Sequence, residues 1–337
     1  MGRATQRPAA TARRTHATVP VQAGGLTLLT EPAFSTRASP PGFAGPTRHQ
    51  PPGVMLDALP HVDLVLASHN HHNHHLDHLD EASIRGLAHQ AGGPPQFIVP
   101  LGLKAWLADK GVHHAIELDW WELHQVEGVE VTLVPAQHWS GRGVTDRMKT
   151  RWGGFAVLAP DCHLFFAGDT GYSRDFEDIR AHFAERQADH AGGGFDIALL
   201  PIGAYEPRWF MAGQHVNVHE AVKIHRDLGA KRSLGVHWGT FELTDEALDE
   251  PPRALGRLRA AEGIHENDFF VMAIGETRIV PRLSPYWHPF GGQTPQPTQE
   301  AIEWTSGAFS WRGHYSVPPC LRGPWRPLPG PARARVC

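Results

Sequence analysis

Histidine and aspartate are the residues of this sequence whose number and spacing could do chemistry. The chain of 337 residues contains 24 histidines, and six of them fall within residues 69–78, which read HNHHNHHLDH. Neutral imidazole nitrogens and carboxylate oxygens are ligands for Zn²⁺, and also for iron or manganese. The three cysteines cannot form a disulfide framework, and cysteine-based metal sites can be set aside. The sequence therefore predicts a metal site built from histidine and carboxylate.

Two pairs of potential ligands stand at the ends of this histidine-rich stretch. His69 and His71 follow an apolar run, and in extended backbone their imidazoles point to the same side and can hold one ion. Asp77 and His78 are adjacent and precede a helical pattern that begins at Glu81. Because neighbouring side chains splay at such a loop-to-helix turn, we expect this second pair to reach a second ion.

Three further candidate ligands lie far along the chain, and each follows an apolar run. These runs are VTLVPAQ before His138, LFFAG before Asp169 and SLGV before His237, and LVLAS precedes His69 in the same way. Ligands at strand ends sit on a rigid scaffold at one edge of a sheet. His138 could complete the first ion and His237 the second, with Asp169 as a bridge. Two ions about 3.5–4 Å apart can hold a hydroxide at neutral pH and clamp a phosphoryl oxygen.

The elements that must carry these residues alternate between short apolar strands and amphipathic helices. Gly24 and Gly25 supply the turn of a hairpin between the first two strands. The pattern predicts strands at 17–21, 26–29, 62–67, 96–99, 129–134, 154–158, 164–167, 197–201, 233–236 and 269–273. It predicts helices at 81–90, 103–110, 219–228 and 251–262.

Composition divides the chain into three parts. Residues 1–14 are polar and basic, and we expect them to be disordered. Residues 15–283 have the composition of a globular domain. Residues 284–337 are rich in proline, tryptophan and arginine without a helical or strand period, so they can hardly build a core of their own. We interpret them as a disordered tail; the alternative is a clamp that docks its tryptophans on the domain.

Charge and hydropathy limit the partners and the location. Lysine and arginine total 31 and aspartate and glutamate total 35, and this net charge of −4 argues against a nucleic-acid partner. No apolar run approaches the 18 residues of a membrane span, and residues 1–20 lack the apolar middle of a secretory signal. The low cysteine count suits a reducing compartment, so we expect a cytoplasmic protein.

The order of the candidate ligands resembles the signature of the metallo-β-lactamase superfamily: a histidine pair, Asp-His, a distant His, a distant Asp and a last His. Within it the chain closely resembles the family of N-acylphosphatidylethanolamine-hydrolysing phospholipase D and its bacterial relatives. Matching segments run through nearly the whole predicted domain and include SHNH at 68–71, DHLD at 77–80, PAQHWS at 135–140, FFAGDTGY at 165–172, PIGAYEPRWFM at 201–211, QHV at 214–216 and HWGTF at 237–241.

This resemblance implies a fold, a cofactor and a ligand set. The fold would be of the α+β class, an αββα sandwich with two mixed β-sheets face to face and helices outside. The cofactor would be two divalent metal ions, with Zn²⁺ expected. The first ion would be held by His69, His71 and His138, the second by Asp77, His78 and His237, and Asp169 would bridge them.

The resemblance also implies an activity and partners. The reaction would be hydrolysis of N-acylphosphatidylethanolamine to N-acylethanolamine and phosphatidic acid, by a hydroxide held between the two ions. Asp77 and Asp169 would be the catalytic carboxylates, and His215, Tyr205 and Trp139 would meet the substrate. The family suggests a phospholipid substrate, peripheral contact with a membrane and a homodimer.

Two departures from the family pattern stand out. The stretch between His69 and His78 is four residues too long, and Glu31 stands where the family usually has aspartate. Either the longer loop bulges at His72–His75 and leaves the four ligands of this stretch in place, or His74 replaces His78 as the metal ligand. We favour the bulge.

The longer loop leaves other functions open. The chain could be a metallo-hydrolase of the same fold that acts on another ester, a lactone or another phosphodiester. It could also be a catalytically impaired homologue that binds metal or lipid.

Overall fold

The computed structural model describes residues 10–13, 15–38, 45–70, 78–141, 146–190 and 192–281. Contacts divide the chain into two units, Met1–Pro289 and Phe290–Cys337, and all described residues belong to the first. His71, His74 and Asp77 lie outside the described residues, and so does the predicted tail at 284–337.

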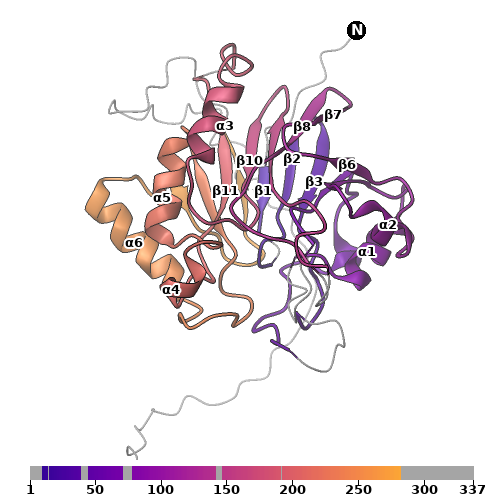
Figure 1. Cartoon of the computed structure of the whole chain (residues 1–337), viewed down its shortest axis with the longest axis horizontal. Coiled ribbons are helices and arrows are strands. Elements are labelled where there is room, and N and C mark those ends of the chain that lie inside the picture. Colours follow the sequence, from indigo (N-terminus) through magenta and orange to yellow (C-terminus); the bar gives the residue numbers. More distant parts are fainter. Residues whose placement is uncertain are drawn as a thin grey trace, which may run out of the picture. The chain divides into compact units, whose positions relative to one another are not determined.

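Two seven-stranded sheets form the described unit (Figure 1). The first sheet has the order β14-β1-β2-β3-β4-β5-β6, and the second has the order β13-β12-β11-β10-β9-β8-β7. The strands of the first sheet are β1 (Ala10–Ala12), β2 (Pro20–Ala23), β3 (Leu26–Thr30), β4 (Leu64–Leu66), β5 (Gln96–Pro100), β6 (Ile116–Leu118) and β14 (Thr277–Ile279). Those of the second are β7 (Leu123–Val126), β8 (Val129–Val134), β9 (Gly154–Leu158), β10 (His163–Phe166), β11 (Ile197–Pro201), β12 (Ser233–Val236) and β13 (Phe269–Phe270).

Each sheet mixes antiparallel and parallel pairs. β1, β2 and β3 are antiparallel neighbours, while β3, β4, β5 and β6 run parallel. In the second sheet β7 to β10 are antiparallel and β10 to β13 are parallel. Because the parallel strands of one sheet end at the same edge, the loops after β10 and β12 can approach one another.

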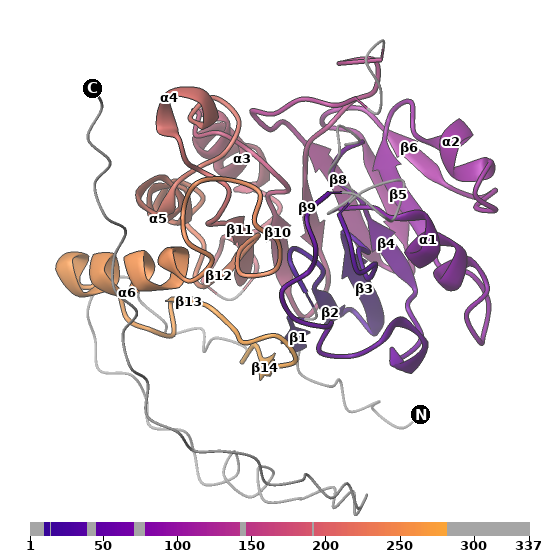
Figure 2. The same cartoon turned by 90° about the horizontal axis from the view of Figure 1, so that it is seen from below.

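Helices cover the outer face of each sheet, as Figures 1 and 2 both show. α1 (Glu81–Ala88) and α2 (Lys104–Ala108) belong to the first sheet, and α3 (Asp175–Phe183), α5 (Val218–Asp227) and α6 (Glu250–Glu262) belong to the second. The short α4 (Arg208–Met211) precedes α5, and a 3-10 turn occupies Leu56–Ala58. This arrangement confirms the predicted αββα sandwich of the α+β class.

The alternation of side chains along single strands explains the layers. In β11, Ile197 and Leu199 belong to the core between the sheets, whereas Ala198 and Leu200 belong to the core under the helices. Successive side chains of a strand point to opposite faces, so a strand that is buried on both faces must be apolar throughout. The continuous apolar runs in the sequence are therefore central strands of a four-layer fold.

The prediction that residues 1–14 are disordered is wrong for residues 10–12. Ala10–Ala12 forms β1, whose residues pair with β2 on one side and with β14 on the other. β14 is far from β1 in sequence, and no local pattern marks a three-residue strand. The N-terminal segment thus enters the first sheet before the predicted domain boundary.

Candidate metal centre

Four predicted ligands meet at one edge of the sandwich. His69 follows β4, His138 follows β8, Asp169 follows β10 and His237 follows β12 directly. All four side chains are buried, with 9% exposure or less. The first comes from one sheet and the others from its partner, so the two sheets together position the site.

His78, His237 and Asp169 form a nearly equilateral triangle of ligand atoms. His78 Nε2 lies 3.0 Å from Asp169 Oδ2, His237 Nε2 lies 3.3 Å from the same oxygen, and the two nitrogens are 3.2 Å apart. Bonds of 2.0–2.1 Å to a tetrahedral Zn²⁺ would place its ligand atoms about 3.3 Å apart. The donor types and spacing of this triangle fit one such ion.

A second candidate set shares the same carboxylate. Ligand atoms of His69, His138 and Asp169 lie within 4.8 Å of one another. The imidazole centres of His69 and His138 are 4.8 Å apart, and that of His69 is 4.5 Å from His78 in the triangle. Asp169 therefore stands between two groups of histidines, where a bridging ligand would have to be.

In three of the histidines, the ring nitrogen Nδ1 lies near an oxygen atom of a neighbouring residue. His69 Nδ1 lies 2.8 Å from Ser68 Oγ, and His138 Nδ1 donates to the carbonyl oxygen of Gln214 at 3.1 Å. His78 Nδ1 lies 3.5 Å from Glu31 Oε2. The carbonyl oxygen can only accept, so it fixes the tautomer of His138 and leaves its Nε2 for a metal ion, while Ser68 and Glu31 lie on the Nδ1 side of the other two rings.

Burial and neighbouring charge set the protonation of the site. Burial lowers the pKa of His138 to about 4, so its ring is neutral and able to bind metal at pH 7. Burial alone would raise the pKa of the Asp169 carboxyl, but His237, His78 and His215 hold it well below its usual range. The centre thus presents an ionised carboxylate at neutral pH.

His215, predicted to meet the substrate, lies against both ligand sets. Its Nε2 is 3.9 Å from Asp169 Oδ2, and its ring centre is 5.2 Å from that of His138 and 5.4 Å from that of His237. It lies between α4 and α5, and the capping box of Asn217 and Glu220 starts α5 two residues later. His215 is therefore a buried histidine of the site that belongs to neither predicted ligand set.

The other two predicted substrate residues occupy different positions. Trp139 follows His138 and donates from Nε1 to Gln214 Oε1 at 2.7 Å, so it lies beside the site. Tyr205 is buried in the core between the second sheet and its helices. Burial and the nearby Glu246 raise the pKa of Tyr205 to about 12, so it is a neutral phenol.

Both described ends of the histidine-rich loop reach the site. His69 and His78 contact each other, and Asn70 accepts a hydrogen bond at its carbonyl from the amide of Gly141 at 2.7 Å. The roles of His71, Asp77 and the alternative ligand His74 stay predictions, because these residues lie outside the described ranges.

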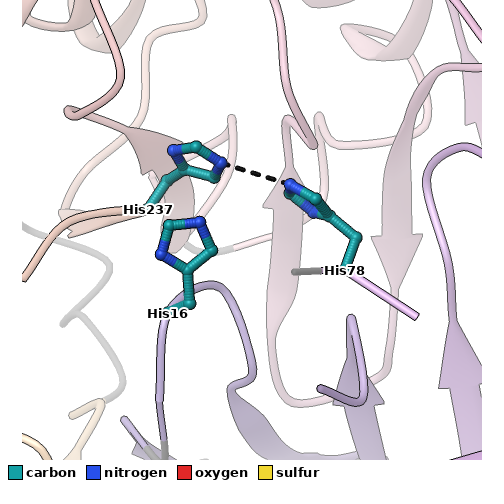
Figure 3. A group of neighbouring side chains, drawn as sticks. All are labelled: His16, His78 and His237. Carbon is teal, nitrogen blue, oxygen red and sulfur yellow. Dashed lines mark hydrogen bonds between the residues drawn. The ribbon is translucent and has the colours of Figure 1, made fainter. Parts of the chain in front are cut away.

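Sequence reasoning missed the roles of two buried residues at the centre. Glu31 follows β3, accepts at Oε1 from the amide of Ser68 at 2.7 Å and contacts His78 at Oε2. His16 precedes β2 and, with His78 and His237, forms another group of histidines whose ligand atoms lie within 4.8 Å (Figure 3). The only sequence signals were the departure from aspartate at position 31 and a histidine beside an apolar strand.

Comparison with known proteins supports this architecture. Residues 27–238 match the family described as "Beta-lactamase superfamily domain". An N-acyl-phosphatidylethanolamine-hydrolyzing phospholipase D of Caenorhabditis elegans is 37% identical over 273 residues, covering 77% of this chain and 73% of the relative. An uncharacterized protein of Mycobacterium tuberculosis is 40% identical over 281 residues, covering 81% and 70%.

A solved structure shows the same fold. A metallo hydrolase from Ignicoccus hospitalis superposes with a TM-score of 0.56 at 20% identity, over 81% of this chain and 98% of that one. The buried histidine–aspartate groups are consistent with metal binding in such a fold.

Proposed function

Because the chain belongs to the metallo-β-lactamase superfamily, we propose that its buried histidine–aspartate centre is the active site of a phosphodiesterase that depends on two metal ions. The substrate is N-acylphosphatidylethanolamine, and the products are N-acylethanolamine and phosphatidic acid. The observation that carries this proposal is the triangle of His78, His237 and Asp169, with ligand atoms 3.0–3.3 Å apart.

Two zinc ions would be held by the two histidine groups. His69, His71 and His138 would hold the first ion, Asp77, His78 and His237 would hold the second, and Asp169 would belong to both sets. When bound, the pair supplies an activated water at neutral pH and stabilises negative charge on a phosphoryl oxygen. Catalysis would then depend on the exact mutual position of these side chains.

The remaining residues orient the ligands and the substrate. Ser68, Glu31 and the carbonyl of Gln214 hold the imidazoles of His69, His78 and His138 in place. Asp77 orients the attacking water or accepts its proton. His215, beside Asp169, is positioned to donate a hydrogen bond to a phosphate oxygen. Trp139, whose ring centre lies 6.0 Å from that of His138, would meet the substrate.

The phospholipid assignment rests on relatives of the chain. The Caenorhabditis elegans relative named above and a mitochondrial relative in Saccharomyces cerevisiae, 39% identical over 241 residues and 48% of its length, carry the same phospholipase D name. We extend that substrate class to this chain, and with it the expected homodimer.

Exposed aromatic residues support contact with a membrane. In α4, Trp209 is 86% exposed and Phe210 is 61% exposed, and His215 of the site follows four residues after this helix. Tryptophan and phenylalanine bind readily at the lipid–water interface. Within the described part of the chain, no helix has the length and apolar character that a membrane crossing requires.

Replacing Trp209 and Phe210 together by alanine should weaken binding to phospholipid vesicles by at least about 10-fold, because each ring buries apolar surface at the interface. Vesicle flotation measures this, and hydrolysis of a short-chain, monomeric substrate should be unchanged. Leu123→Ala is the matched control, since Leu123 is an exposed apolar residue on the edge strand β7. Equal flotation of the double variant and the wild type would exclude this surface.

The proposed reaction is tested with chelator-treated protein that is reloaded with zinc. Reloaded protein should release phosphatidic acid and N-acylethanolamine from vesicles that contain N-acylphosphatidylethanolamine, and the metal-free protein should release neither. Protein that binds two ions but releases no phosphatidic acid would refute this substrate and point to another ester. Protein that binds no ion would refute the metal-dependent mechanism.

A further inference from the structure

His16 lies at the centre but belongs to neither proposed ligand set. It comes from the loop between β1 and β2, its ring is 1% exposed, and it packs against His237 with ring centres 3.9 Å apart. Figure 3 shows the ring of His16 beside that of His237, which also contacts His78. The question is whether this ring binds metal or holds a residue that does.

The spacing of the rings distinguishes a ligand from a packing partner. Two imidazoles bound to one tetrahedral ion at 2.0–2.1 Å have ring centres about 5 Å apart. His78 and His237 meet this requirement, with centres 5.1 Å apart. His16 and His237, at 3.9 Å and tilted by 50°, are too close to share such an ion. The contact is therefore one of packing.

The backbone joins the same two residues. The amide of His237 donates to the carbonyl oxygen of His16 at 3.1 Å. His237 has a φ of 63°, in the left-handed region that residues other than glycine adopt only when their surroundings hold them there. The bond to His16 is one such restraint, so the segment before β2 stabilises both the backbone and the ring of His237.

Arg13 fastens this segment to the same loop. Its buried guanidinium donates to the carbonyl oxygens of Met272, at 2.9 Å, and Trp238, and it lies 4.1 Å from the centre of the Trp238 ring. Arg13 therefore holds Trp238, the residue that follows His237, in place.

We propose that His16 is a positioning residue that holds the imidazole of His237 in the orientation needed for the second metal ion, and that Arg13 anchors it. This inference rests on the proposed metal centre. Residues that orient a metal ligand without touching the ion usually change its affinity by about 10–100-fold when they are replaced.

The test compares His16→Phe with His16→Ala. Phenylalanine keeps a flat ring against His237 but has no nitrogen, whereas alanine removes the packing surface. Co²⁺ titration of metal-free protein, followed by the visible spectrum and by metal analysis, reports the affinity of each ion without any turnover. We expect His16→Phe to bind the second ion within about 3-fold of the wild type, and His16→Ala to bind it about 10–100-fold more weakly.

The matched control is His225→Ala. His225 is a largely buried histidine whose Nδ1 contacts Ser233 Oγ, at the opposite end of β12 from His237, and its loss should leave both ions unchanged. If His16→Phe does not fold, as judged by circular dichroism, Arg13→Lys replaces it; this variant loosens the same segment and should weaken the second ion selectively.

Two results would overturn the inference. An equal loss of the second ion in His16→Phe and His16→Ala would make the ring nitrogen a ligand. If His16→Ala, or Arg13→Lys where it is used, binds the second ion as tightly as the wild type, the contact between His16 and His237 has no role in metal binding. Failure of the wild type to bind two ions is a different result, which refutes the proposed function itself.

Discussion

Asp169→Asn should reduce phosphodiester hydrolysis by about 10²–10³-fold and lower the metal content from two ions to one or fewer per chain. The carboxylate lies within 3.9 Å of three imidazoles and belongs to both ligand sets. Asparagine keeps its shape but removes the negative charge. Removing one partner of a buried charged group typically costs about 3–5 kcal/mol, or roughly 10²–10⁴-fold, and the expected loss of activity lies in the lower part of that range.

Asp161→Asn is a matched control for this experiment. Asp161 is also a buried aspartate, but it lies in the turn before β10, at the other end of the strand that leads to Asp169. Its Oδ1 accepts from the amide of Gly24, and asparagine keeps that oxygen. We expect both activity and metal content of this variant to match the wild type. If Asp169→Asn binds two ions and keeps full activity, Asp169 does not have the proposed bridging role.

Glu31→Gln should weaken the second ion by about 10–100-fold, with a matching loss of activity at limiting zinc. The carboxylate accepts from the amide of Ser68 and places Oε2 3.5 Å from His78 Nδ1. Glutamine can keep one of these contacts but not both, because an amide group directed at Nδ1 no longer favours the tautomer that leaves Nε2 for metal. Isothermal titration of metal-free protein with zinc measures the change.

Excess zinc should restore much of the activity of Glu31→Gln, because the ligand itself remains. Glu122→Gln serves as the control, since Glu122 accepts a hydrogen bond from the amide of Asp119 at an exposed turn and touches no ligand. A Glu31→Gln protein that binds both ions with wild-type affinity would contradict the role assigned to Glu31.

Central strands such as β9 and β11 could be predicted from sequence because burial on both faces makes them continuously apolar, and β8 could be predicted from its alternation of apolar and polar residues. The predicted bounds 129–134, 154–158, 197–201 and 233–236 agree with β8, β9, β11 and β12. The αββα arrangement came from the family resemblance, and the two sheets confirm it.

Short and peripheral elements escaped prediction for physical reasons. β1 and β14 exist because they pair with each other across the whole domain, with Ala10 opposite Ile279. α4 has only four residues and exposes Trp209 and Phe210, so it lacks a helical apolar period. Such elements depend on tertiary contacts that a local pattern does not contain.

The candidate site was predictable where residues stand at the ends of strong strands, as His138 and His237 do. His16 and Glu31 could not be assigned in this way. Their roles arise from contacts with His237 and His78, which are more than 200 and more than 40 residues away in sequence. The His16–His237 contact exists only after the two sheets have packed, and the Glu31–His78 contact joins segments that lie on either side of β4.

Anomalous diffraction at the zinc absorption edge, from crystals of the zinc-loaded protein, tests the central claim most directly. The account predicts two peaks about 3.5–4 Å apart on either side of Asp169. One should be within bonding distance of His78 and His237, and the other of His69 and His138. A single peak, or two peaks that do not share Asp169, would contradict a dinuclear centre at this edge of the sandwich.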